Sequence, residues 1–256
     1  MGNPFISCQC VTYARVERLE EAIACFLCQT VTDSELVILN TFPLQKLSFN
    51  HPRVRIINLE TRPPCLGAAR NSCVPISKAG RVVIWDDDDL YLPHHLETFA
   101  RHFGQNQWLS FVGHFQANNF QIKGVGGFVQ NQIGYTKEAW WRMGGYGSIN
   151  SGEDRDFNDR LRAKCRGRWV HLKPDELSFI MSWNNGVCHI SGLGEDKAGE
   201  ASGYDRVANW VRERVATGAV RTGNIVLRPR LSRDWSAMAK GYLAQMPAKD
   251  AATCPT

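Results

Sequence analysis

Four consecutive aspartates, Asp86 to Asp89, follow directly after the mostly apolar run Arg81–Trp85. Such a run is typical of a short buried strand in a mostly parallel sheet. Four adjacent carboxylates repel one another unless cations neutralise them, and Mg²⁺ and Mn²⁺ prefer hard oxygen ligands. In open α/β sheets, ligands bind at the carboxyl ends of the strands. The motif therefore predicts an α/β sheet with a metal-bound phosphate group at the end of this strand.

Hydrophobic periodicity divides the chain into alternating strands and helices. In the first part we expect strands at Phe5–Val11, Glu35–Leu39, Val54–Leu59 and Arg81–Trp85, and helices from Val16 to Thr30, over Leu66–Ser77 and from Pro93 to Phe103. This order predicts a Rossmann-like half-sheet that binds a nucleotide. Beyond Gln105 we expect strands at Trp108–Phe115, Asn119–Gln130, Trp169–Leu172 and Leu177–Trp183, and helices at Lys137–Met143, from Ser151 to Cys165 and at Val207–Val215. Gly124, Gly126 and Gly127 are expected to break the second of these strands.

The composition is that of an ordinary globular protein. The 256 residues are 43% hydrophobic and 21% charged, which suits one large domain or a domain with an appendage. No apolar run approaches the roughly 20 residues that span a bilayer, so we expect no transmembrane segment. The N-terminus lacks a signal-peptide pattern, and the nine cysteines favour reduced thiols over a disulfide framework. We therefore expect a cytosolic protein, in a bacterium or a phage-infected host.

Basic residues gather in the C-terminal third. Between residues 206 and 233 there are seven arginines and one acidic residue, Glu213. Such a segment can contact the phosphates of a polyanion or an anionic membrane surface. A solvated face with a few salt bridges is the alternative. The arginines that we assign to a polyanion such as duplex DNA are Arg206, Arg212, Arg214, Arg221, Arg228 and Arg230.

A second acidic position lies at the start of the helix that follows Gly152. Asp154 shares a helical face with Phe157 and Leu161, so we expect it to point inward with them. A carboxylate in a first helical turn can serve as a cap or as a partner of the helix dipole. It can also serve as a general base at the edge of a cleft. The residue pattern alone leaves both roles open.

Several segments, in a fixed order, resemble the family-2 glycosyltransferases of the GT-A fold. They are Thr12-Tyr13-Ala14-Arg15, Leu66-Gly67-Ala68-Ala69-Arg70-Asn71, Asp86-Asp87-Asp88-Asp89 with Pro93, and Gly144-Gly145 followed by Gly152-Glu153-Asp154. The resemblance implies an α/β fold of GT-A type, with a mixed, mostly parallel central sheet flanked by helices. It also implies a nucleotide-sugar-binding half over residues 1–104 and an acceptor and catalytic half over residues 105–200. Residues 201–256 would then form a basic helical extension.

The resemblance also implies roles for single residues. Around the nucleotide of the donor it places Thr12, Tyr13, Arg15, Asn40, Arg70, Asp86 and Asp87. Asp88, with Asp86, would hold the Mn²⁺ or Mg²⁺ that bridges the donor diphosphate. His189 is a further candidate ligand, because neutral imidazole suits Mn²⁺. Asp154, with Glu153 beside it, matches the catalytic base of the inverting members, and Asp89 is expected to cap the following turn.

Asn40 departs from the family pattern, which commonly has an aspartate at the end of the second strand to read the donor base. An amide offers both a hydrogen-bond donor and an acceptor, whereas a carboxylate only accepts. A UDP-sugar remains the donor that we expect.

The resemblance leaves the acceptor open. The arginine-rich segment, with Trp210 and Trp235 among its arginines, favours DNA, whose 5-hydroxymethylpyrimidines some phage enzymes glycosylate. A lipid-linked or soluble glycan is the alternative acceptor. A non-catalytic module that binds a nucleotide sugar or DNA is the alternative of another class, and it requires Asp154 to be only a cap. A nucleotidyltransferase is disfavoured because Thr12–Arg15 is not a glycine-rich phosphate loop.

Overall fold

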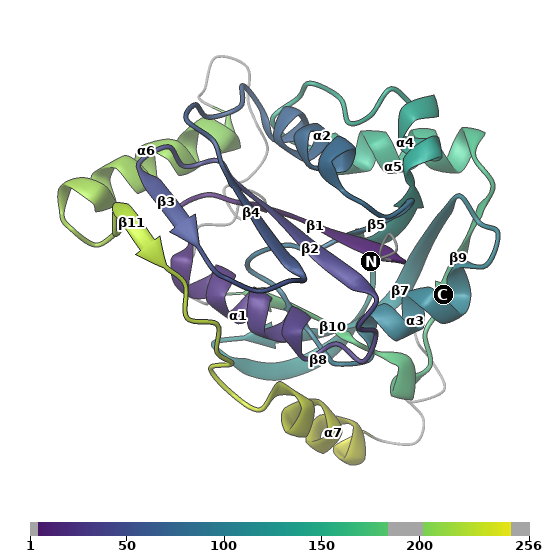
Figure 1. Ribbon diagram of the computed structural model, residues 1–256. Coiled ribbons are helices and arrows are strands. Elements are labelled where there is room, and N and C mark those ends of the chain that lie inside the picture. The colour runs from purple at the N-terminus through teal and green to yellow at the C-terminus, as the bar shows by residue number, and fades with distance from the viewer. Residues whose placement is uncertain (1–4, 184–201, 247–256) are drawn as a thin grey trace.

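The computed structural model describes residues 5–183 and 202–246. These residues form three layers, in which helices cover both faces of a central nine-stranded sheet (Figure 1). The strands of this sheet are β1 (Ile6–Thr12), β2 (Ser34–Asn40), β4 (Val54–Asn58), β5 (Arg81–Ile84), β6 (Leu90–Tyr91), β7 (Trp108–Asn118), β8 (Gln121–Thr136), β9 (Gly167–His171) and β10 (Phe179–Trp183). Their order is β4-β2-β1-β5-β8-β7-β10-β6, and β9 pairs with β7.

The sheet is mixed but mostly parallel. Strands β4, β2, β1 and β5 pair in parallel, whereas β8 runs antiparallel to both β5 and β7. Parallel strands covered on both faces are expected to be apolar throughout, and β2 is indeed buried along its whole length. The predicted mixed, mostly parallel sheet flanked by helices is confirmed.

Two sets of helices cover the two faces of the sheet (Figure 1). One set is α1 (Val16–Leu27), α3 (His95–Phe103) and α7 (Trp235–Gln245), whose buried side chains join one hydrophobic cluster. The other set is α2 (Leu66–Ile76), α4 (Lys137–Arg142) and α5 (Glu153–Lys164). In α1, Leu19, Ile23 and Phe26 recur at helical spacing and are fully buried, as their pattern predicts.

Some elements were not predicted from the sequence. Strands β3 (Gln45–Ser48) and β11 (Gly223–Val226) pair in parallel as a second, two-stranded sheet. Both are short and come from distant parts of the chain, so neither carries a long periodic pattern. The expected break in β8 is wrong, because the strand continues through its glycines. At Gly126 a Cβ atom would lie 2.4 Å from the ring of His114, so this glycine permits close approach of β7.

The C-terminal segment contains α6 (Gly203–Ala216), β11 and α7. Strand β11 and helix α7 join the hydrophobic cluster of α1, whereas α6 packs against Phe42. Two buried carboxylates of α1 hold the segment in place. Glu20 accepts a hydrogen bond from the backbone N–H of Arg228 at 2.9 Å, and Glu21 accepts one from the indole N–H of Trp235 at 3.0 Å. Across the described residues, no helix combines the length and apolar composition that crossing a bilayer requires.

Candidate active site

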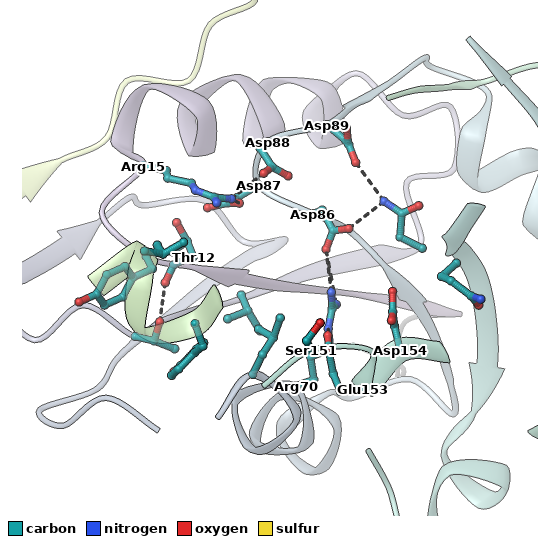
Figure 2. A pocket seen from close by; sticks show the side chains of 18 of the residues that line it. Thr12, Arg15, Arg70, Asp86, Asp87, Asp88, Asp89, Ser151, Glu153 and Asp154 are labelled. Atoms are coloured by element: carbon teal, nitrogen blue, oxygen red, sulfur yellow. Dashed lines mark hydrogen bonds and ion pairs between the residues drawn. The ribbon is translucent and has the colours of Figure 1, made fainter. Parts of the chain in front are cut away.

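A cavity of about 440 Å³ lies where β1 and β5 end. Its wall includes Thr12, Tyr13, Arg15, Arg70, Asp86, Asp87, Asp88, Asp89, Glu153 and Asp154. Figure 2 shows the aspartates that follow β5 on one side of the cavity and the start of α5 on the other. Acidic residues that lie far apart in the sequence therefore share one cavity, as expected for the carboxyl edge of an α/β sheet.

Arg15, between β1 and α1, lies against two of the four aspartates. Its Nη1 atom is 2.9 Å from Asp87 Oδ1 and 2.6 Å from Asp88 Oδ2. Although burial opposes the charged guanidinium, the two carboxylates hold the pKa of Arg15 above its ordinary value. The carboxylates of Asp87 and Asp88 thus stabilise one positive charge, that of Arg15, at the cavity wall.

Asp87 and Asp89 lie in the cavity wall, but both residues are buried. Burial raises the pKa of Asp87 to about 6, although the charge of Arg15 opposes the shift. Asp89 accepts hydrogen bonds at 3.0 Å from the backbone N–H of Ser182 and from Nδ2 of Asn131. Burial, reinforced by the neighbouring charges of Asp88 and Asp86, raises its pKa well above the ordinary value. Asp89 therefore holds β10 in place. The sequence had led us to expect that Asp89 caps the turn that follows the aspartate run, and its hydrogen bonds correct that expectation.

The first turn of α5 presents two adjacent carboxylates in different environments. Glu153 is buried and lies 3.1 Å from Nε of Arg70, whose Nη2 is 3.4 Å from Asp86 Oδ1. Burial raises the pKa of Glu153, and Arg70 opposes that shift. Asp154 is partly exposed and lines the cavity. The expectation that Asp154 shares the buried face of the helix needs correction, because Glu153 and not Asp154 continues that face.

The close packing of α2 against the segment before α5 brings Arg70 to Glu153. At Gly67, in the first turn of α2, a Cβ atom would lie 1.9 Å from the backbone oxygen of Gly147. Only glycine therefore allows this approach. Asn71, the next residue after Arg70, donates to the backbone oxygen of Tyr146 at 2.9 Å. The predicted segment from Leu66 to Asn71 thus fixes α2 relative to α5.

Asn40 is not among the residues that line the cavity. It is fully buried, and its Nδ2 donates to the backbone oxygen of Gln45 and to Oδ1 of Asn58, at 2.8 and 2.9 Å. Its Oδ1 accepts from the backbone N–H of Phe42 at 3.1 Å. These bonds occupy the amide in shaping the connection between β2 and β3, so the structure does not bring Asn40 to the predicted nucleotide site.

Two polar residues of β8 line the cavity without having been predicted. Nδ2 of Asn131 lies 2.9 Å from Asp86 Oδ2 and 3.0 Å from Asp89 Oδ2, and so links the two ends of the aspartate run. Gln130 accepts from Nδ2 of Asn158 in α5 at 2.8 Å. Both residues lie in a strand whose one charged residue is Lys123 and which carries no recognised motif, so their position became visible only through the pairing of β8 with β5.

The C-terminal segment also contributes to the cavity wall, through Tyr204 of α6. The guanidinium of Arg62 stacks against the rings of Tyr204 and Tyr13, with its central carbon 3.5 and 4.5 Å from their centres. Arg62 Nη2 donates to the backbone oxygen of Tyr204 at 2.7 Å. This stack joins α6 to the end of the cavity that contains Tyr13.

The residues fit a hard divalent cation only in part. Among the described residues, no group of three His, Cys, Asp or Glu side chains could hold a metal ion alone. Asp86 and Asp88 nevertheless offer carboxylate oxygens, and Mg²⁺ often binds one or two carboxylates while substrate phosphates and water complete its shell. A nucleoside diphosphate would have to supply further oxygens here. His189 lies outside the described residues.

Comparisons with known proteins point to one family. Residues 8–152 match the family model described as glycosyl transferase family 2. Over 101 residues the chain is 33% identical to the uncharacterized glycosyltransferase YwdF of Bacillus subtilis (strain 168). That stretch covers 38% of this chain and 37% of the relative, so the match spans little more than a third of the relative's length.

Solved structures of low sequence identity share the fold. S. aureus TarS 1–349 in complex with UDP-GlcNAc has a TM-score of 0.59 at 15% identity, covering 82% of this chain and 66% of that chain. The mannosyltransferase PcManGT from Pyrobaculum calidifontis, in complex with GDP-Man and Mn²⁺, has a TM-score of 0.53 at 14% identity, covering 98% and 82%. At such identities the likeness establishes the fold alone, and it confirms the predicted GT-A fold. Since the family model covers more than half of the chain, the chain belongs to glycosyltransferase family 2.

Proposed function

We propose that the protein is a glycosyltransferase that moves a sugar from a nucleotide-sugar donor to an acceptor hydroxyl. One observation carries this proposal: two acidic groups, Asp86 with Asp88 after β5 and Asp154 at the start of α5, line one cavity. Sugar transfer needs both the neutralisation of a leaving diphosphate and a base for the attacking hydroxyl. Membership of the family supports the same class of reaction.

The donor that we propose is a UDP-sugar. Thr12 and Tyr13 offer polar and aromatic groups for a nucleoside at the end of β1, and Arg15 and Arg70 offer positive charge for a diphosphate. TarS was solved with UDP-GlcNAc and PcManGT with GDP-Man. These relatives support a nucleoside diphosphate sugar as the donor class, and the preference for uridine rests on the sequence resemblance.

We further propose that Asp88 and Asp86 hold Mn²⁺ or Mg²⁺ together with the donor diphosphate. Such an ion, when bound, neutralises the negative charge that develops on the leaving diphosphate. Arg15 contacts Asp88 and Arg70 contacts Asp86, and all four side chains lie in the cavity wall. PcManGT was solved with Mn²⁺, which supports this choice of ion.

Asp154 is the catalytic base in this proposal. The acceptor oxygen attacks the anomeric carbon while the bond from that carbon to the diphosphate oxygen breaks, and the hydroxyl proton passes to the carboxylate of Asp154. Attack from the side opposite the leaving group inverts the configuration of the sugar. Glu153 is buried and paired with Arg70, whereas Asp154 is partly exposed at the cavity. Of the two carboxylates, Asp154 is therefore the one open to a substrate.

For the acceptor we propose the hydroxymethyl group of a 5-hydroxymethylpyrimidine in DNA. Support comes from the exposed arginines Arg212, Arg228 and Arg230 in the C-terminal segment, because phosphate contacts supply most non-specific DNA affinity. A lipid-linked or soluble glycan is the competing acceptor class.

A donor and acceptor panel tests the proposed function. The protein is incubated with Mn²⁺ and each of several nucleotide sugars, with hydroxymethylated duplex DNA, unmodified duplex DNA or a glycan acceptor, and the released nucleoside diphosphate is measured. We expect release from a UDP-sugar that rises with hydroxymethylated DNA, together with a matching gain in the mass of the DNA. Tight binding of UDP without release from any donor would contradict the enzyme and favour a non-catalytic binding module. Transfer to the glycan alone would overturn the DNA acceptor.

A further inference from the structure

A second cavity, of about 230 Å³, lies between the start of α1 and the C-terminal segment. Its wall includes Arg15 and Arg18 from the start of α1 and Arg214 and Arg221 from the C-terminal segment. These arginines come from nearly opposite ends of the chain. Glu17 is the one acidic residue in the described wall. Arg15 contacts Asp87 and Asp88, and Arg18 contacts Glu21, so the positive charge that favours an anionic ligand in this concave site is that of Arg214 and Arg221.

The contacts of Arg214 and Arg221 leave them able to bind such a ligand. Arg221 pairs with Glu17 at 3.1 Å, but both side chains are more than half exposed, so the pair contributes little and can exchange partners. The guanidinium of Arg214 stacks on Trp210, 4.6 Å from the ring centre. Its Nε atom is buried and has no hydrogen-bond partner among the described residues. The indole thus orients a guanidinium that still has hydrogen-bonding capacity.

The backbone at the start of α1 adds to the positive potential. Arg15 is the N-cap residue of this 12-residue helix, and its side chain forms no capping hydrogen bond. Val16, Glu17 and Arg18, which form the first turn, all line the second cavity. The first N–H groups of a helix carry the positive end of its dipole and suit phosphate binding. Arginines and backbone therefore favour the same kind of ligand.

The geometry favours phosphate over a single carboxylate. Phosphate presents several oxygens and a high charge, so it can accept hydrogen bonds from more than one guanidinium fork. Gln45, also in the wall, is buried, and its Nε2 donates to the backbone oxygen of Arg221 at 2.6 Å. This bond ties β3 to the segment that carries Arg221 and holds the wall together.

We propose that this second cavity binds a phosphate group through Arg214, Arg221 and the start of α1. Of the described wall residues, Arg15 alone lines both this cavity and the proposed donor cavity. The side chain of Arg15 would then lie between the bound phosphate and the two aspartates that it contacts, Asp87 and Asp88. Binding at this site does not depend on the proposed transfer reaction.

Calorimetric titration of the full chain tests the proposal, with inorganic phosphate, methyl phosphate and a short unmodified DNA duplex as separate ligands. The cavity variant is Arg214→Met with Arg221→Met. The matched control is Arg233→Met with Lys240→Met, which removes the same charge from exposed positions of the same segment outside the wall. We expect the cavity variant to raise the Kd for phosphate at least about tenfold, or about 1.4 kcal/mol, and the control to leave it within about twofold. The inorganic and methyl phosphate arms distinguish free phosphate from a phosphate ester.

Two further readouts keep the result interpretable. The Kd for UDP should be the same in both variants as in the unchanged protein, which shows that the chain is folded and the donor cavity intact. In NMR spectra of the unchanged protein, the indole N–H resonance of Trp210 should shift as phosphate is added. The proposal is overturned if that resonance does not move at saturating phosphate, or if both double variants lose phosphate or DNA affinity equally. Equal loss would mean diffuse surface charge.

Discussion

Nε of Arg70 lies 3.1 Å from Oε1 of Glu153, and the same guanidinium reaches Asp86 on the opposite side of the cavity. One buried cation thus connects the end of β5 to the start of α5. The connection holds the two acidic groups of the proposed active site in a fixed relation. It also neutralises Glu153. Of the two carboxylates that α5 places in the cavity wall, Asp154 is the more exposed, and Arg70 pairs with the other.

The Arg70→Met variant tests this connection. It leaves the buried carboxylate of Glu153 without its counter-charge, which should lower the free energy of unfolding by about 3 kcal/mol or more. Adding Glu153→Gln should restore part of the loss, because the unpaired charge is then gone. Arg101→Met, at a side chain that is 54% exposed, should change stability by less than about 0.5 kcal/mol. Urea unfolding measures all three, and equal losses in the single and double variants would contradict the assignment.

Two neighbouring aspartates should respond differently to substitution. Asp88→Asn should weaken Mn²⁺ binding in the presence of UDP at least about tenfold, because an amide oxygen is a poorer ligand than a carboxylate. Asp89→Ala should instead lower stability by about 1 to 3 kcal/mol, since the N–H of Ser182 and the amide of Asn131 lose their acceptor. Manganese titration and thermal unfolding separate the two effects. Similar losses of manganese affinity in both variants would refute the division of roles.

Asn40 provides a test of base recognition. Asn40→Asp replaces an Nδ2 donor that faces two oxygen acceptors, so we expect a loss of about 2 kcal/mol in stability at neutral pH. UDP affinity of the folded variant should stay within about twofold. Asn209→Asp, at an exposed position of α6, is the matched control and should affect neither quantity. A large change in UDP affinity with normal stability would return Asn40 to the nucleotide site.

The stability of the protein should depend on the protonation of Asp87. Its pKa is about 6 in the folded protein against an ordinary value of 3.8. The folded state therefore binds this proton more tightly than the unfolded state, and the contribution of Asp87 to stability falls as the pH rises from about 4 to about 6. Burial raises the pKa of Asp89 and Glu153 in the same direction.

The Asp87→Asn variant removes the titrating group. Relative to the unchanged protein, it should gain stability as the pH rises across this window, by of the order of 1 to 3 kcal/mol. Denaturant unfolding at about pH 4.5 and pH 7 measures the difference. Asp159→Asn, on the exposed side of α5, should show no such gain. A constant difference between Asp87→Asn and the unchanged protein at both values would contradict the assignment.

The sequence predicted those parts of the site that lie in continuous motifs. Three parts of the site lie in short continuous runs whose residue types indicate their place in the fold. They are the aspartates after β5, the segment with Arg70 and the start of α5. The cavity brings these runs together because parallel strands end at a common edge. Hydrophobic periodicity predicted the alternating strands and helices of the first half of the chain, and the family resemblance implied the mostly parallel sheet flanked by helices.

Contacts between distant strands and loops could not be predicted in this way. The pairing of β3 with β11 joins segments that carry no marked pattern, and Asn131 reaches Asp86 and Asp89 only through the register of β8. At Asn40 the motif position was recognised, but the hydrogen bonds that turn its amide inward depend on Gln45 and Asn58. At α5 the helix was recognised, but Arg70 decides which carboxylate is buried.

The most direct test of the proposed mechanism is Asp154→Asn, compared with Asp156→Asn on the same helix. Asp156 is 44% exposed and pairs with Arg160, so its substitution controls for the loss of one charge. With a UDP-sugar, Mn²⁺ and an active acceptor, we expect Asp154→Asn to lower kcat by about 10²- to 10⁴-fold while the Kd for UDP is unchanged, and Asp156→Asn to leave both within about twofold. Unchanged kcat in Asp154→Asn would show that this carboxylate is not the base.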